Sequence, residues 1–147
     1  MLTNKPVNPT LPAVDLKRAR QFYEEKLGLK VVIDDPIVGL MLMAGENTYL
    51  YLYQRAATKA EHTVAQFHVD DLAAEVKELQ SKGITFEEYD IPEMGLKTMN
   101  GIAKMSSPEG EIKGAWFKDT EGNILALVEL SANLKQKVSS KVAEAKI

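Results

Sequence analysis

Cysteine is absent from the 147 residues of this chain, which excludes disulfide bonds, thiolate metal sites and a cysteine nucleophile. Histidine is scarce, with two residues, so a hydrolase triad has few residues to draw on. No Walker-type glycine loop, G-x-G-x-x-G motif or H-E-x-x-H motif occurs either. The common signatures of nucleotide-dependent enzymes and zinc proteases are therefore missing.

Long apolar runs and clusters of basic residues are missing as well. No stretch approaches the ~18 apolar residues that cross a bilayer, and residues 1–10 lack the apolar core of a signal peptide. The formal net charge is −3, without a block of Lys and Arg that would contact phosphates. We therefore expect a soluble cytoplasmic protein with neither a membrane nor a nucleic acid as its partner.

Two segments share one pattern, in which a strand leads to an Asp that begins a helix and a Gly that ends it. Residues 7–32 read VNPTLPAVDLKRARQFYEEKLGLKVV, with Asp15 and Gly28 in these places. Residues 63–88 read TVAQFHVDDLAAEVKELQSKGITFEE, with Asp70 or Asp71 and then Gly83. Because apolar residues recur at helical spacing in both segments, each helix should lie with one face against a sheet.

The remaining pattern predicts strands and divides the chain into similar halves. Strands are expected at 30–35, 37–44, 49–53, around His68 and at 124–130. Each half then reads strand–helix–strand–strand–strand, which indicates an α+β fold. We expect one domain at 1–131, with half-modules at about 7–54 and 62–131, followed by a weakly helical tail at 132–147 that either docks on a partner subunit or frays.

The stretch 90–114 is long for a connection inside a compact domain, so it is either functional or contains extra structure. We expect a short strand around Ile102–Met105 and a mobile segment beside the site. Met94, Lys97 and Met99 either close over a bound molecule or belong to a solvated loop.

Three segments, LPAVDLKRARQFYEEKLGL, FHVDDLAAEVKELQSKGITFEE and AWFKDTEGNILALVEL, occur in an order that resembles the vicinal oxygen chelate superfamily. That group includes glyoxalase I, bleomycin-resistance proteins, fosfomycin-resistance enzymes and extradiol dioxygenases. The resemblance covers residues 7 to 131. It implies paired βαβββ modules, each curling into part of an open barrel, assembled as a homodimer.

The resemblance also implies four metal-ligand positions, one on each of four strands, which in metal-binding members carry His, Gln or Glu. The equivalent positions in this chain are Asn8, Val64, Ala126 and Tyr49, with Leu50 replacing Tyr49 after a slip of one residue. Catalytic Zn, Ni, Mn or Fe needs imidazole or carboxylate ligands. Glu129 does not rescue the site, because it points to the opposite face of its strand from Ala126. We therefore expect no metal and no other cofactor.

Strand alternation predicts which side chains line the cavity between the halves. The expected ligand-binding residues are Asn8, Thr10, Tyr49, Tyr51, Tyr53, Val64, Gln66, His68, Trp116 and Ala126. The tyrosines either contact the ligand or pack across strands, and Trp116 walls the pocket, stabilises a dimer seam or packs in the core. Asp119 and Asn123 are expected to bond nearby backbone in a turn.

His68 is the sharpest single candidate in the sequence. It is either a ligand hydrogen-bond partner, a general base, or a histidine that its neighbours satisfy at a strand end. The first functional hypothesis is a metal-free small-molecule-binding protein with an apolar and aromatic pocket, similar to the bleomycin-resistance branch. The alternative is a glyoxalase- or dioxygenase-type lyase or oxygenase with an unorthodox or metal-free site that uses His68.

Overall fold

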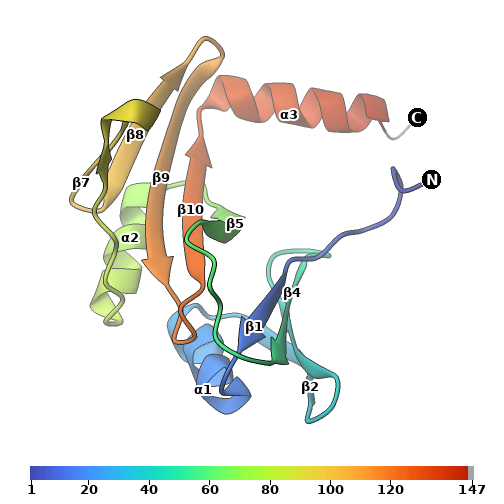
Figure 1. The fold of residues 1–147 in the computed structure, drawn as a ribbon. Coiled ribbons are helices and arrows are strands. Elements are labelled where there is room, and N and C mark those ends of the chain that lie inside the picture. Colours follow the sequence, from blue (N-terminus) through green and yellow to red (C-terminus); the bar gives the residue numbers. More distant parts are fainter. Residues whose placement is uncertain (146–147) are drawn as a thin grey trace.

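The computed structural model describes residues 1–145, which form two β-sheets, each accompanied by a helix (Figure 1). The first sheet has four strands in the order β1-β4-β3-β2, with β1 parallel to β4 and the other neighbours antiparallel. Its module consists of β1 (Thr10–Ala13), α1 (Leu16–Gln21), the π-helical turn η1 (Phe22–Lys26), β2 (Lys30–Asp35), β3 (Gly39–Met43) and β4 (Tyr49–Gln54).

The second sheet has six strands in the order β5-β10-β9-β8-β7-β6, and β5 runs parallel to β10. Its module consists of β5 (Thr63–His68), α2 (Leu72–Ser81), β6 (Asp90–Ile91), the 3-10 turn η2 (Pro92–Met94), β7 (Leu96–Met99), β8 (Ile102–Ser107), β9 (Gly110–Lys118) and β10 (Ile124–Leu130). The βαβββ succession recurs here with β6 and β7 added after the helix. The predicted α+β fold with two βαβββ modules is confirmed.

Both helices begin and end at the predicted residues. Asp15 and Asp71 have extended backbones, and each carboxylate accepts a hydrogen bond from the N–H three residues along. Gly28 and Gly83 follow the helices with φ of 72° and 87°, in the left-handed region that glycine adopts without strain. The local signals in the two copies of the pattern therefore act as predicted.

The strand predicted at 37–44 begins later, at Gly39. The Asp35 carboxylate accepts hydrogen bonds from the N–H groups of Ile37 and Val38, both at 2.8 Å. These bonds also lower the pKa of Asp35, because they stabilise its charged form. The side chain thus holds residues 36–38 in the turn between β2 and β3.

One hydrophobic core lies between the two helices and the sheets that they cover, and it takes residues from both modules. Alternate side chains of each strand point to this core face, and the others point to the opposite face, which we call the open face. In β4 the side chains of Leu50 and Leu52 are buried, whereas Tyr49, Tyr51 and Tyr53 are half-buried on the open face. The predicted division of β4 is therefore observed.

The stretch 90–114 contains more regular structure than we expected. A strand at Ile102–Ser107 confirms the one predicted there, but β6, β7 and the start of β9 occupy most of the remainder. Lys97 and Met99 lie on β7 rather than on an irregular loop, so the expectation of a loop at these residues is wrong. Successive antiparallel pairing of β6, β7, β8 and β9 satisfies the backbone of this stretch.

The predicted tail forms helix α3 at Ala132–Ala145, and residues 146 and 147 lie outside the described residues. Figure 1 shows α3 leading away from the end of β10, and no α3 residue is buried. Among the helices of residues 1–145, none is long and apolar enough to cross a membrane.

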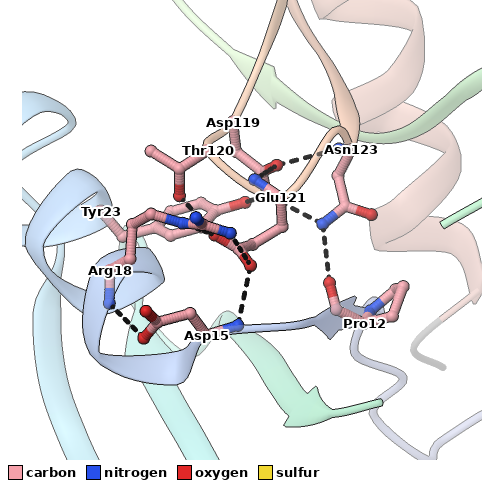
Figure 2. A network of polar contacts seen from close by, with 8 residues as sticks. All are labelled: Pro12, Asp15, Arg18, Tyr23, Asp119, Thr120, Glu121 and Asn123. Atoms are coloured by element: carbon pink, nitrogen blue, oxygen red, sulfur yellow. Dashed lines mark hydrogen bonds and ion pairs between the residues drawn. The ribbon is translucent and has the colours of Figure 1, made fainter. Parts of the chain in front are cut away.

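The turn between β9 and β10 joins the second module to the start of α1 (Figure 2). Its Glu121 accepts hydrogen bonds from the Asp15 N–H at 3.0 Å and from the Arg18 guanidinium at 2.9 and 3.0 Å. The Glu121 side chain is fully buried in this contact. We call the bonds between this turn and the first module the inter-module clasp.

Asp119 and Asn123 complete the inter-module clasp. Asp119 accepts hydrogen bonds from the backbone N–H groups of Glu121 and Asn123, which confirms its predicted role in the turn. It also accepts one from the buried Tyr23 hydroxyl at 2.6 Å, and the Asn123 amide donates to the Pro12 carbonyl at 3.0 Å. Both side chains therefore bind the other module as well as their own turn.

The electrostatics of the clasp follow from burial and hydrogen bonding. Burial alone would raise the pKa of the Glu121 carboxyl, but hydrogen bonds from Arg18, the Asp15 N–H and Thr120 outweigh it and lower this pKa from 4.5 to about 2. The pKa of the Tyr23 hydroxyl is raised well above 10, first by burial and then by the charge of Asp119. Glu121 is therefore charged and Tyr23 neutral at neutral pH.

We expect Glu121→Gln to lower the free energy of unfolding at pH 7 by up to about 3 kcal/mol, the equivalent of the pKa difference between 4.5 and about 2. Because the folded chain has the lower pKa, this stabilisation is complete above pH 4.5 and is lost as the pH falls toward 2. In urea titrations, the free energy of unfolding should fall less steeply between pH 4.5 and about 2 for the variant than for the wild type. The exposed Glu46→Gln serves as the control, and an unchanged pH dependence in E121Q would contradict the assignment.

Candidate functional site

A pocket lies at the junction of the two modules and brings together four of the predicted ligand-binding residues. Asn8 and Tyr49 line it from the first module, and Gln66 and His68 line it from β5 of the second. Its volume is about 430 Å³, which is within the usual range for small-molecule sites. We call it the junction pocket.

Gln66 and His68 form the polar wall of the junction pocket. They lie two residues apart on β5, so their side chains share one face, and the Gln66 amide nitrogen is 3.4 Å from His68 Nε2. The contact joins the Gln66 amide to the imidazole edge of His68, so the two side chains present hydrogen-bonding groups together at the pocket. Among the described residues that line this pocket, none carries a carboxylate that would orient His68 as a general base.

A second hollow follows along β4, where Tyr51 and Tyr53 face the turn between β2 and β3. It has a volume of about 520 Å³, and Thr10 of β1 also lines it. The rings of Tyr51 and Tyr53 are stacked, with centroids 6.2 Å apart and planes 9° apart. We call this hollow the tyrosine groove.

Both tyrosine hydroxyls of the groove already have protein partners. The Tyr51 hydroxyl donates to the Val38 carbonyl, which holds the β2–β3 turn over the groove. The Arg55 guanidinium donates to the Tyr53 hydroxyl at 3.0 Å and lies 5.8 Å from the centre of its ring. The groove therefore offers aromatic faces to a ligand more readily than free hydroxyl groups.

The other predicted site residues lie apart from both hollows. Ala126 is 1% exposed, so it presents almost no surface to a ligand. Val64 packs against the hydrophobic core. The pairing of β5 with β10 slips at this point, with Thr63 opposite Ile124 and Ala65 opposite Leu125, so Val64 has no partner in the register. This bulge interrupts the two-residue period from which we placed Val64 on the cavity face.

Trp116 forms a wall on the open face of the second sheet, directly opposite Ala126 in the register. Its indole nitrogen donates to the Thr63 hydroxyl at 3.1 Å, and its ring meets Tyr89 edge-on at 5.7 Å. The ring lies close over Gly114, where an added Cβ would come within 2.9 Å of it. Thr63 and Tyr89 were not predicted from the sequence as neighbours of Trp116. The bulge in β5 changes the face on which Thr63 lies, and Tyr89 lies outside the predicted strands.

The four family metal positions do not fit a divalent metal ion. Asn8 supplies only an amide and Tyr49 a phenol, while the side chains of Val64 and Ala126 have no donor atom. The slip to Leu50 does not help, because that side chain is buried in the core. Within residues 1–145 no group of three or more His, Cys, Asp or Glu residues is placed to hold a metal ion.

Glu129 is used in another way, on the opposite face of β10 as predicted. Its carboxylate accepts a hydrogen bond from the Leu72 N–H at 2.9 Å at the start of α2, and it forms an ion pair with Lys113 at 3.4 Å. These contacts hold the carboxylate on the helix side of the sheet. A metal on the open face is therefore out of its reach.

Residues 6–127 match the family model described as the Glyoxalase/Bleomycin resistance protein/Dioxygenase superfamily, and the chain belongs to this superfamily. No curated protein matches the chain.

Solved structures with the same fold are numerous and have unlike functions in their names. One is TnmS3, an antibiotic-binding protein from Streptomyces sp. CB03234, with 24% identity, a TM-score of 0.59 and coverage of 87% of this chain and 98% of that one. Another is a lactoylglutathione lyase from Agrobacterium tumefaciens, with 20% identity, a TM-score of 0.61 and coverage of 89% and 96%. A glyoxalase family protein from Enterococcus faecalis has 20% identity, a TM-score of 0.62 and coverage of 88% and 100%. At these identities the likeness shows the fold alone.

Proposed function

We propose that this chain is a metal-independent small-molecule-binding protein of its superfamily. The ligand is a partly aromatic organic molecule that occupies the junction pocket and extends over the tyrosine groove. One observation carries the proposal: the four positions where the family holds a metal have no suitable donor set, while the same strands present stacked tyrosines and the Gln66–His68 pair.

The chemistry of the two hollows supports a ligand of this kind. Stacked rings at Tyr51 and Tyr53 favour a flat aromatic partner, because offset stacking adds to the gain from burying apolar area. Gln66, His68 and Asn8 add a small number of hydrogen-bonding groups, which would fix the orientation of the ligand. The name of the antibiotic-binding relative fits a binding role, although that name describes only the other protein.

We also propose that two copies of the chain form a homodimer. Helix α3 leads away from the domain with Leu134, Val138 and Val142 four residues apart on one side, and the last two are about half exposed. The open face of the first sheet carries the exposed Ile33, which lies opposite Met41, and the neighbouring Val32 is exposed at the bulge of β2. A second copy would cover such surface.

The dimer proposal predicts a mass in solution twice the 16.3 kDa of one chain. Light scattering after gel filtration measures this mass directly. The apolar side of α3, which carries Val138, would contribute to the interface. Val138→Lys should therefore raise the dissociation constant of the dimer, whereas Ser139→Lys on the same exposed helix should leave it unchanged. A wild-type mass of one chain at micromolar concentration would contradict the proposal.

The second candidate function is metal-free acid–base catalysis by His68, in a lyase or oxygenase of the glyoxalase or dioxygenase type. It is favoured by the placement of the imidazole at the wall of the junction pocket, with Nε2 turned toward Gln66. It would be supported by a His68→Ala variant that keeps its affinity for a substrate but loses turnover.

The hypothesis of a metal-independent binding protein predicts that the purified protein contains little bound metal. Protein expressed without an affinity tag and purified without chelator should contain less than about 0.1 equivalent of Zn, Ni, Mn or Fe, because ligand sets for these ions need imidazole, thiolate or carboxylate groups. Elemental analysis by mass spectrometry measures this content. A stoichiometric transition metal would overturn the proposal.

The ligand-binding reading predicts that the two histidines of the chain behave differently. A thermal-shift screen of aromatic compounds should yield ligands that stabilise the wild type, and titration calorimetry should then show weaker binding to His68→Ala and Tyr53→Ala. A loss of about tenfold is expected for His68→Ala, the usual effect of removing one hydrogen bond from a buried ligand. His62→Ala is the matched control, because that histidine is not among the residues that line the junction pocket and bonds to the Thr63 carbonyl. Equal losses in both histidine variants, or no ligand from a broad screen, would contradict the reading.

A further inference from the structure

A row of charged side chains crosses five strands of the second sheet on its helix side, away from the junction pocket and the tyrosine groove. In strand order from β10 to β6 the row is Glu129, Lys113, Lys104, Lys97 and Asp90. Lys97 and Lys104 each lie one residue beyond the Thr98–Ala103 pair of the β7–β8 ladder, so they face each other across it. We call this arrangement the lysine row.

The centre of the lysine row has an excess of positive charge. Like charges directly opposite one another on neighbouring strands destabilise a sheet, and Lys104 has a lysine on either side. Lys113 is partly neutralised by its ion pair with Glu129 at 3.4 Å. Within the described part of the chain, neither Lys97 nor Lys104 forms an ion pair.

Asp90 lies opposite Lys97 without forming an ion pair with it, and the carboxylates of Asp71 and Glu129 are committed to helix α2. Asp71 accepts the hydrogen bond that begins this helix, from the Ala74 N–H at 3.1 Å, and Glu129 accepts one from the Leu72 N–H. Both groups therefore offset the N-terminal end of α2 rather than the two remaining lysines.

The three lysines border a groove of about 650 Å³ between β7, β8, β9 and the first turn of α2. Its other lining residues include the apolar Ala73, Met99 and Ile102, together with the carboxylates of Asp71 and Glu129. Met99 is 73% exposed and lies opposite Ile102 in the register, so a large apolar side chain stands uncovered beside the cationic centre. An apolar floor with two unpaired ammonium groups is complementary to an amphipathic anion.

We propose that this groove is a second binding site, specific for a small carboxylate with an apolar body. The carboxylate pairs with Lys97 and Lys104 and relieves the repulsion along the row, while the apolar body covers Met99, Ile102 and Ala73. This site is independent of the proposed function, because it uses the opposite face of the second sheet and none of the residues of the junction pocket or tyrosine groove.

Decanoate below its micellar concentration is the probe for this site. Calorimetry should show saturable binding of decanoate, at least tenfold weaker binding of acetate, which lacks the apolar body, and at least tenfold weaker binding of decanol, which lacks the charge. Lys104→Gln and Lys97→Gln should each weaken decanoate binding about tenfold, and Lys59→Gln on an exposed segment is the control. His68→Ala should leave decanoate binding unchanged.

The lysine variants also carry a signature that does not depend on the ligand. Because Lys104→Gln removes a charge flanked by like charges, the unliganded variant should melt at a temperature equal to or above that of the wild type. Equal affinity for decanoate and decanol, or undiminished decanoate binding in both K104Q and K97Q, would overturn the proposal. Hexaglutamate that displaces decanoate and binds more tightly than decanoate would also overturn the proposal, because it would indicate that the groove binds an acidic protein segment.

Discussion

The inter-module clasp at the β9–β10 turn is the contact on which the rest of the structure depends. Glu121 is buried in the turn, and a buried carboxylate needs charged and polar partners. It finds them on the first module, at Arg18 and at the N–H of Asp15. The two repeats could otherwise be separate half-domains, each with its own sheet and helix. The clasp, shown in Figure 2, joins them into one body with one core, and the first module meets β5 at the junction pocket.

Given that arrangement, the chemistry of the site is decided by strand alternation. The open face of β4 carries three tyrosines while its leucines fill the core, and β5 adds Gln66 and His68 across the junction. Polar groups that would be suitable for a metal lie elsewhere. Glu129 holds the start of α2, and Asp119 and Glu121 hold the clasp. The superfamily scaffold is therefore retained in this chain while its carboxylates serve structural roles, and the cavity is left with aromatic and amide groups.

Much of the fold could be predicted from the sequence because its signals are local. The Asp and Gly ends of the helices, the Tyr-Leu alternation of β4 and the strand at 124–130 all depend on neighbouring residues, and the structure shows each of them. The misplacement of Val64 has a different origin. One inserted residue in a parallel pair changes the face of every side chain before it, and no composition signal marks a bulge at this point.

The clasp and the lysine row were also beyond sequence reasoning, because both depend on contacts between distant residues. Arg18 and Glu121 are 103 positions apart, and no local pattern in either segment indicates that they pair. The three lysines of the row come from three strands and all lie in the stretch 90–114, where we predicted only one short strand, around Ile102–Met105. Only the register of β7, β8 and β9 shows that these charges lie side by side.

The central claim is that an aromatic molecule binds at the junction pocket and the tyrosine groove without a metal ion. Nuclear magnetic resonance tests it most directly, by mapping the shifts that an aromatic ligand causes on isotope-labelled protein, with and without a chelator. The account predicts shifts concentrated at Tyr49, Tyr53, Gln66 and His68, identical in both samples. Shifts that disappear on chelation, or that avoid these residues, would contradict it.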